Sequence, residues 1–80
     1  MNIQKIWKNI RKPIEKEISP INYGLWIQPL KPLKLEEEKL VLTSPNSYTS
    51  TFFEDRYKKL VENLVSKIAG KKIHIEIKET

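Results

Sequence analysis

Apolar residues near the N-terminus recur at the spacing of an amphipathic α-helix, and they predict a helix over residues 2 to 18. Asn2 is a suitable N-cap for this helix. Pro13 removes one backbone donor inside the pattern, so we expect a kink or a break near Lys12. The apolar stripe comprises Ile3, Ile6, Trp7, Ile10 and Ile14, with Ile18 at its edge.

A second, short helix is predicted to begin at Ser19-Pro20, with serine as N-cap and proline at the first helical position. It should stop before Pro29. This helix is apolar on two sides and so needs two covers, of which we expect the helix over residues 2 to 18 to be one. Gly24 is expected to permit a close backbone approach. The residues expected to join this helix to the sheet are Leu25, Trp26, Ile27 and Leu30.

Alternation of apolar and polar residues predicts three strands. Pro32–Glu36 and Lys39–Thr43 flank the acidic run Glu36–Glu38, and this arrangement indicates a β-hairpin with a solvated turn. Lys72–Lys78 is the most regular strand. It places Ile73, Ile75 and Ile77 on one face and His74 and Glu76 on the other.

The third helix is predicted to begin at Asn46, which can cap it, and to run to about Ala69, with Gly70 as its C-terminal stop. Tyr48 and Phe52 point away from the apolar face of a continuous helix. Either the helix bends within residues 49 to 51, or these two aromatics form a surface patch. The apolar face comprises Phe53, Tyr57, Leu60, Val61, Leu64 and Ile68.

The predicted order is helix, helix, strand, strand, helix, strand, and we interpret residues 1–80 as a single α+β domain. A three-stranded sheet with helices packed against one face is the natural arrangement. This architecture is KH-like. The RNA clamp of KH domains needs a GxxG loop, which two isolated glycines, Gly24 and Gly70, do not supply.

Composition narrows the function. The 80 residues include no cysteine, which excludes disulfides and thiolate metal sites. No apolar run is long enough to span a membrane, so we expect a cytosolic protein. A net charge of +5 gives a mild attraction to polyanions. Four lysines line the polar side of the first helix, either as a solvated face or as a weak contact for single-stranded DNA. They are Lys5, Lys8, Lys12 and Lys16.

The sequence contains few residues that could form a catalytic site. His74 is the only histidine, and no serine or aspartate near it in the pattern suggests a triad. We therefore expect neither an enzyme nor a cofactor or metal site. Binding to other proteins is the class of function that remains. Exposed aromatics make effective contacts there, and the candidates are Trp7, Tyr48 and Phe52. Each of the three could instead belong to the core.

Several of these residues together resemble a known family, the N-terminal domain (domain I) of the bacterial chromosomal replication initiator DnaA. The resemblance rests on Trp7, on the segment Leu25–Leu30 and on Ser44–Tyr48, which is similar to the PN-x-aromatic element of the family. Phe52 stands where a tryptophan is usual, and Tyr57 follows. The resemblance covers essentially the whole chain.

The resemblance implies a KH-like interaction domain without ATPase activity, which in the family resides in a separate domain. It implies self-association, recruitment of a replicative helicase of the DnaB type, binding of a DiaA/HobA-like regulator, and weak affinity for single-stranded DNA. By position, Trp7 would contribute to self-association, and Asn22, Tyr48 and Phe52 to partner binding. Asn22 stands where an acidic residue is associated with the helicase contact.

Overall fold

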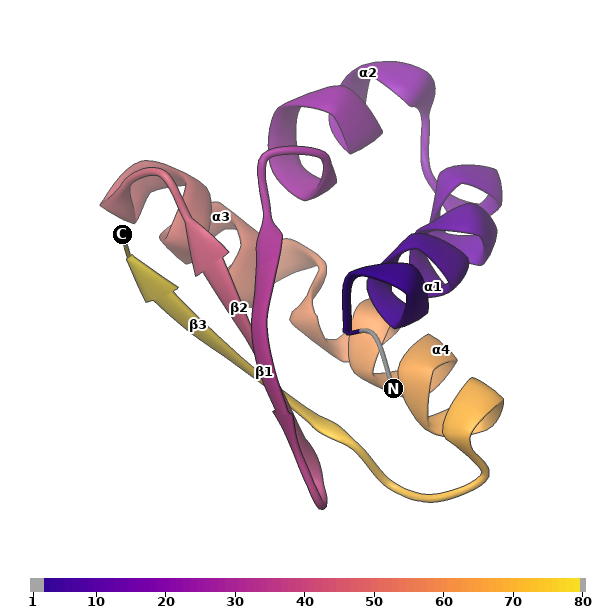
Figure 1. Cartoon of the computed structure of the whole chain (residues 1–80). Coiled ribbons are helices and arrows are strands. Elements are labelled where there is room, and N and C mark those ends of the chain that lie inside the picture. Colours follow the sequence, from indigo (N-terminus) through magenta and orange to yellow (C-terminus); the bar gives the residue numbers. More distant parts are fainter. Residues whose placement is uncertain (1–2, 80) are drawn as a thin grey trace.

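The computed structural model describes residues 3–79, and its elements follow the predicted order with two modifications (Figure 1). The second helix ends in a π-helical segment, and the third helix is divided in two. Asn2, the predicted N-cap of the first helix, lies outside the described residues. The elements are α1 (Ile3–Glu17), α2 (Pro20–Asn22), η1 (Tyr23–Ile27), β1 (Lys31–Glu36), β2 (Lys39–Ser44), α3 (Ser47–Arg56), α4 (Lys58–Ala69) and β3 (His74–Glu79).

Of the two expected alternatives near Lys12, a kink or a break, the break is wrong, because helix α1 runs continuously through Pro13. Ile10 and Ile14 are both buried in the core, and they hold the helix on either side of the proline. Trp7 is buried with them. Tertiary packing therefore offsets the loss of one backbone hydrogen bond.

The short second helix begins as predicted. The Ser19 side chain accepts a hydrogen bond from the backbone N–H of Asn22 at 3.2 Å, which makes Ser19 the N-cap. From Tyr23 the chain winds as the π-helix η1, in which the N–H of Gln28 donates to the Tyr23 carbonyl at 2.9 Å. Segment η1 packs against both α1 and α3. Helix α1 is therefore one of the two expected covers, whereas Ile21 and Leu25 of this helix remain exposed.

Gly24 does not serve the close approach that the sequence suggested. A Cβ added at Gly24 would meet only the Oε1 atom of Gln28, at 3.7 Å, which is an ordinary contact. Gly70 is different, because it ends α4 in the left-handed region at φ 73°. The glycine is therefore required at the end of α4 and dispensable in η1.

We expect Gly24→Ala to raise the free energy of unfolding by about 0.5–1 kcal/mol, because alanine reduces the entropy of the unfolded chain without a clash. Gly70→Ala should lower it by about 1–2 kcal/mol, because a side chain disfavours the left-handed conformation. Urea denaturation of both variants, followed by circular dichroism, measures the two changes in the free energy of unfolding. Changes of the same sign in the two variants would contradict this assignment.

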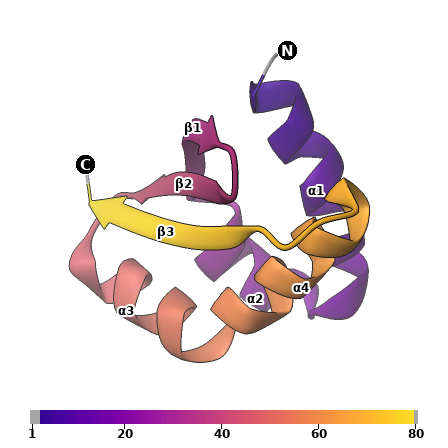
Figure 2. The same cartoon turned by 90° about the horizontal axis from the view of Figure 1, so that it is seen from below.

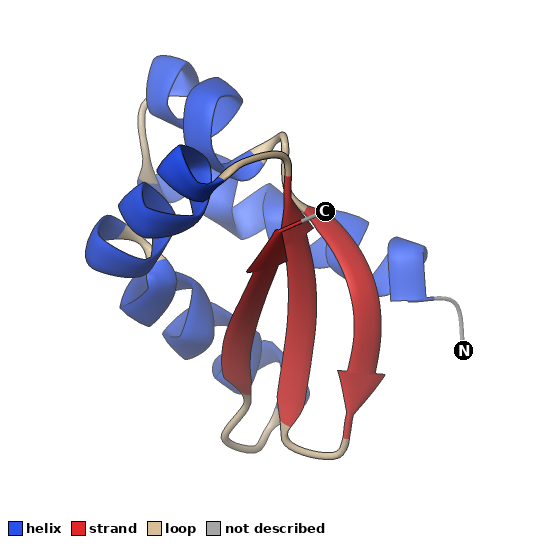
Figure 3. Ribbon diagram, turned by 90° about the vertical axis from the view of Figure 1, so that its left-hand side faces the viewer, coloured by secondary structure: helices blue, strands red, loops and turns tan. Residues whose placement is uncertain are grey.

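The sheet has the strand order β1-β2-β3. Strand β1 runs antiparallel to β2, and β3 runs parallel to β2. Helices α3 and α4 connect the parallel pair and run along one face of the sheet (Figure 2). The strands leave their opposite face free of helices (Figure 3). The predicted hairpin is confirmed. Strand β3 begins at His74, slightly later than the pattern suggested.

On the helix-free face, a row of ion pairs crosses all three strands. Glu36 lies 3.1 Å from Lys34 and 3.9 Å from Lys39, and Lys39 lies 3.7 Å from Glu76. Val41 pairs with Lys34 and Glu76 in the strand register, so it sits beneath this row. It is fully buried although it does not belong to the core cluster. The long charged side chains therefore exclude water from Val41 with their aliphatic stems.

The hydrogen bond from Lys34, followed by the charges of Lys34 and Lys39, holds the pKa of the Glu36 carboxyl below its ordinary value of 4.5. A depressed pKa stabilises the fold above the ordinary value, and this contribution is lost as the pH falls below it. We expect Glu36→Gln to reduce the fall in melting temperature between pH 6 and about pH 3. Glu37→Gln, in the same turn, is the control. An unchanged pH profile in Glu36→Gln would contradict a role for these pairs.

The predicted helix from Asn46 to Ala69 is two helices, with the break at Tyr57 and not within residues 49 to 51. Tyr57 leaves the regular helical conformation at φ −119° and ψ −15°. The break allows Phe53 on α3 and Val61 on α4 both to reach the core, where each is fully buried. The separate direction of α3 also decides the surroundings of Tyr48 and Phe52.

Candidate functional site

An aromatic patch, consisting of Trp26, Tyr48 and Phe52, joins the end of η1 to helix α3. The Trp26 and Phe52 rings are stacked, with centroids 3.8 Å apart and planes 10° from parallel. The Tyr48 ring lies 5.5 Å from the Trp26 centroid at a tilt of 41°. The Arg56 guanidinium lies over the Phe52 ring, 5.5 Å from its centroid. The three rings thus support one another across two elements.

Tyr48 is the exposed member of the aromatic patch. Its side chain is 70% exposed, whereas Trp26 and Phe52 are half-buried. Tyr48 and Phe52 are four residues apart on α3 and therefore lie on the same side of that helix. Of the two alternatives left open by the sequence, the surface patch is the correct one. Trp26 forms its floor.

A buried polar cluster fixes the start of α3, and with it the position of Tyr48. The Oδ1 atom of Asn46 accepts the N–H of Thr49 at 2.8 Å, which confirms the predicted cap. The hydroxyls of Ser44 and Ser50 both donate to the Asn46 carbonyl, at 3.0 and 3.2 Å, and they also contact each other. Ser44 belongs to β2, so the cluster attaches the first turn of α3 to the central strand.

Two exposed aliphatic residues were not predicted as surface residues. Ile21 on α2 is exposed, and Leu25 on η1 is 54% exposed, although Leu25 was expected to join the helix to the sheet. Ile27 and Leu30 do bury as expected. The π-helical winding changes which side chains of this segment face inward, and no residue in the sequence marks it. The apolar character on two sides of the helix was the only available signal.

The other predicted residues separate into two groups. Asn22 ends α2, on the same continuous segment as Trp26, and is half-buried. Trp7 is 3% exposed and belongs to the core, so it does not present a surface for contact. The four lysines of α1 are all exposed, and they are Lys5, Lys8, Lys12 and Lys16. The structure thus brings Tyr48 and Phe52 together and leaves the residues of α1 outside the aromatic patch.

The titratable side chains Tyr23 and His74 lie outside the aromatic patch. Burial, and then a hydrogen bond and the charge of Glu15, raise the pKa of the Tyr23 hydroxyl, while Arg11 opposes the shift. This tyrosine joins η1 to α1 and remains un-ionised at neutral pH. His74 is exposed on β3. Among residues 3–79, no cluster of three or more acidic, histidine or cysteine side chains could hold a metal ion.

None of the helices in the described part of the chain is long and apolar enough to cross a membrane. The order of helices and strands and the surface around Tyr48 define a small α+β domain of KH-like architecture with an exposed aromatic patch. The chain belongs to the family of the DnaA N-terminal domain, whose family model matches residues 4–67.

Relatives of known name agree with this assignment. The chromosomal replication initiator protein DnaA of Caldanaerobacter subterraneus subsp. tengcongensis is 32% identical over 74 residues, which are 92% of this chain and 17% of that protein. DnaA of Thermoanaerobacter sp. is 31% identical over the same lengths. The chain thus spans 17% of the length of these relatives.

A solved structure confirms the fold. It is the HobA–DnaA (domain I-II) complex from Helicobacter pylori, which matches with a TM-score of 0.79. The match covers 94% of this chain and 96% of the other chain at 20% sequence identity. At this identity the likeness establishes the architecture.

Proposed function

We propose that this domain is the protein-interaction module of a chromosomal replication initiator, and that it binds a regulator of the HobA/DiaA kind through the aromatic patch. The observation that carries the proposal is Tyr48, 70% exposed on the Trp26–Phe52 stack at the capped start of α3. A rigid aromatic side chain that is held by its neighbours loses little entropy on binding. Membership of the DnaA N-terminal domain family and the HobA-bound structural relative support the choice of partner.

Recruitment of a replicative helicase of the DnaB type and self-association complete the proposed role. Asn22 is our candidate for the helicase contact, on the same segment as Trp26. Because asparagine carries no charge, this contact should depend little on salt. Trp7 is buried, so any contribution it makes to self-association runs through its packing.

Replacement of Tyr48 by alanine tests the aromatic patch. We expect Tyr48→Ala to weaken binding of a HobA/DiaA-like regulator from the same genome by at least about thirtyfold, the effect of a hot-spot residue. Isothermal titration calorimetry measures the affinity. Leu33→Ala, which truncates an exposed apolar residue on β1, is the matched control and should bind normally. Equal affinity of Tyr48→Ala and Leu33→Ala would refute the proposed site.

A second candidate function is weak binding of single-stranded DNA. The observation in its favour is the exposure of all four α1 lysines, which were predicted as a basic stripe and are Lys5, Lys8, Lys12 and Lys16. Binding through phosphate contacts weakens steeply with salt. We expect Lys8→Glu combined with Lys12→Glu to abolish the salt-dependent part of single-stranded DNA binding, measured by fluorescence anisotropy at two salt concentrations. An affinity for single-stranded DNA that is the same at both salt concentrations would rule this function out.

A further inference from the structure

The last strand of the chain, β3, has an outer edge that no other strand covers. It is a terminal strand of the sheet, with α3 and α4 on one face (Figure 2). The N–H of His74 donates to the carbonyl of Glu38, just before β2, at 2.8 Å. Because the backbone groups of successive strand residues point to opposite sides, His74 and every second residue after it face β2. The backbone groups of Ile75, Ile77 and Glu79 therefore point outward.

Helix α4 protects only the beginning of this edge. The Ser66 hydroxyl accepts the N–H of Ile73 at 2.8 Å and donates to the carbonyl of the same residue at 3.3 Å. The Glu62 carboxylate accepts the outward N–H of Ile75 at 2.8 Å. Within residues 3–79, the outward N–H and C=O groups of Ile77 have no hydrogen-bond partner. Unpaired backbone groups on a strand edge are a template for pairing with a further strand.

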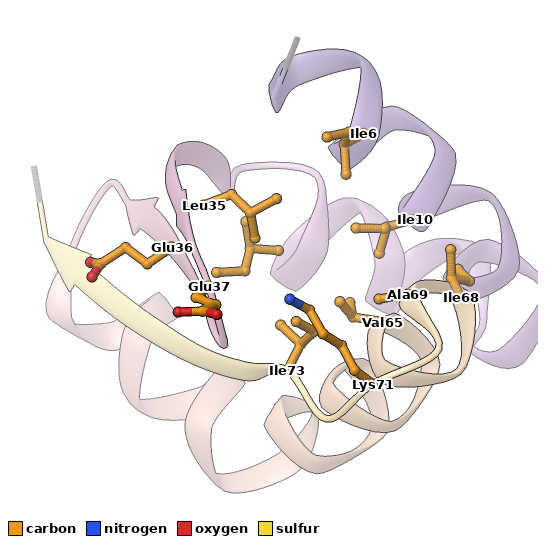
Figure 4. A pocket seen from close by; sticks show the side chains of 11 residues that line it. Ile6, Ile10, Leu35, Glu36, Glu37, Val65, Ile68, Ala69, Lys71 and Ile73 are labelled. Carbon is orange, nitrogen blue, oxygen red and sulfur yellow. The ribbon is translucent and has the colours of Figure 1, made fainter. Parts of the chain in front are cut away.

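The opposite edge of the sheet is less suited to pairing. Pro32 has no N–H, the register of β1 shifts between Pro32 and Lys34, and α1 packs against this strand. The β3 edge is also separate from the apolar groove of about 490 Å³ between α1, the β1–β2 hairpin and the end of α4 (Figure 4). No residue of β3 lines that groove. The open edge is therefore the second half of β3.

We propose that this edge pairs with the same edge of a second copy of the chain, antiparallel, about a two-fold axis at Ile77. The two Ile77 residues then exchange both of their N–H···O=C hydrogen bonds. The N–H of Glu79 donates to the Ile75 carbonyl of the second copy, and the two three-stranded sheets join into one. The inference rests on the self-association included in the proposed function, and it gives that association a surface away from α1.

The charges on β3 select this partner and this register. Glu76 lies directly opposite Lys78 of the second copy, and in the free chain these side chains are 41% and 53% exposed on the helix-free face. An axis moved by one residue would place Glu76 opposite Glu76, or Lys78 opposite Lys78. Opposite charges stabilise a cross-strand pair and like charges destabilise it. Because Glu76 also lies 3.7 Å from Lys39, the pairing continues the ion-pair row across the axis.

A proline substitution tests the backbone contact. Because the contact is short and weak, sedimentation equilibrium should extend to about 1 mM protein, where the wild type should show a monomer–dimer equilibrium. Ile77→Pro removes the outward N–H without removing a hydrogen bond to β2, and it should be monomeric. Ile77→Ala loses the same side-chain packing and keeps the N–H, so its dimerisation should stay within about threefold of the wild type. Circular dichroism of each variant verifies that it is folded.

A charge exchange tests the register. Glu76→Lys and Lys78→Glu should each weaken dimerisation about tenfold, because each places two pairs of like charges across the axis. An equimolar mixture of the two variants should dimerise again, because every altered charge then meets an opposite one. Lys59→Glu, an equal change of charge at an exposed position of α4, is the control and should dimerise like the wild type.

The outcomes separate this surface from other surfaces. A monomeric wild type would leave the edge to an extended segment of an unrelated protein and overturn the proposal. Dimerisation that survives Ile77→Pro, an equal loss in Ile77→Ala, or a mixture no better than the single variants would overturn it as well. Regulator binding by Glu76→Lys should equal that of the wild type. A failure of this inference is therefore distinguishable from a failure of the aromatic patch, which Tyr48→Ala reports.

Discussion

Trp7→Ala is expected to lower the free energy of unfolding by about 3–5 kcal/mol, and so to unfold much of the protein. Trp7 is 3% exposed and packs in the core cluster together with Ile10 and Ile14. Its removal leaves a large cavity that the rigid neighbours fill only in part. A chain of this size has a total stability of roughly 4–12 kcal/mol, from which a loss of this magnitude removes a large part. Urea denaturation monitored by far-ultraviolet circular dichroism measures the change.

Two variants separate the core role of Trp7 from a contact role. Trp7→Phe retains an aromatic ring in the core and should cost much less than Trp7→Ala. The indole N–H has no hydrogen-bond partner in the described part of the chain, so its removal forfeits no bond. Ile21→Ala, at an exposed position, should leave stability within about 0.5 kcal/mol of the wild type. A Trp7→Ala protein with normal stability that only fails to self-associate would reverse the assignment of Trp7 to the core.

The burial of Trp7 bears on the proposed self-association of this chain. The family resemblance attributes it to Trp7, yet the side chain is not available at the surface. Ile6, the preceding residue on the same helix, is only half-buried. A defect in self-association after mutation of Trp7 would therefore follow from a displaced α1.

The elements of the fold were predictable where local chemistry decides them. Ser19 and Asn46 cap helices with their own side chains, and Gly70 takes the left-handed conformation that ends α4. The alternation in β3 is also local, because Ile75 faces the core and Glu76 faces the ion-pair row. These signals depend on a few neighbouring residues and survive any tertiary context.

Features decided by contacts between distant segments were not predictable. Pro13 indicated a break that packing of α1 prevents, and Tyr57 lies at a break that no proline or glycine marks. In the candidate site, Tyr48 and Phe52 were predicted as possible surface aromatics and lie in the aromatic patch, whereas Asn22, predicted at the exposed start of the second helix, ends α2 and is half-buried. The sequence did not show that Trp26 would stack on Phe52, since the two are separated by the whole hairpin. Exposure of Leu25 follows from the π-helical winding, which is equally invisible in the pattern.

The neighbouring phenylalanines of α3 should differ in how much the same substitution lowers stability and how much it lowers binding. Phe53 is fully buried in the core, whereas Phe52 is half-buried in the stack with Trp26. Phe53→Ala should lower the free energy of unfolding by about 3–5 kcal/mol. Phe52→Ala should lower it by about 1–2 kcal/mol, since it loses an aromatic pair and partial burial.

The loss of binding affinity should rank the two variants in the opposite order to the loss of stability, at a temperature where both variants are folded. Phe52→Ala removes the support of Trp26 and Tyr48, so regulator affinity should fall about tenfold or more even though the fold remains. Phe53→Ala leaves the patch residues in place, so its folded fraction should bind with nearly wild-type affinity. Thermal denaturation and calorimetric titration on the same samples give both quantities. If the two variants lost stability and affinity in equal proportion, the aromatic patch would be part of the core and not a separate binding surface.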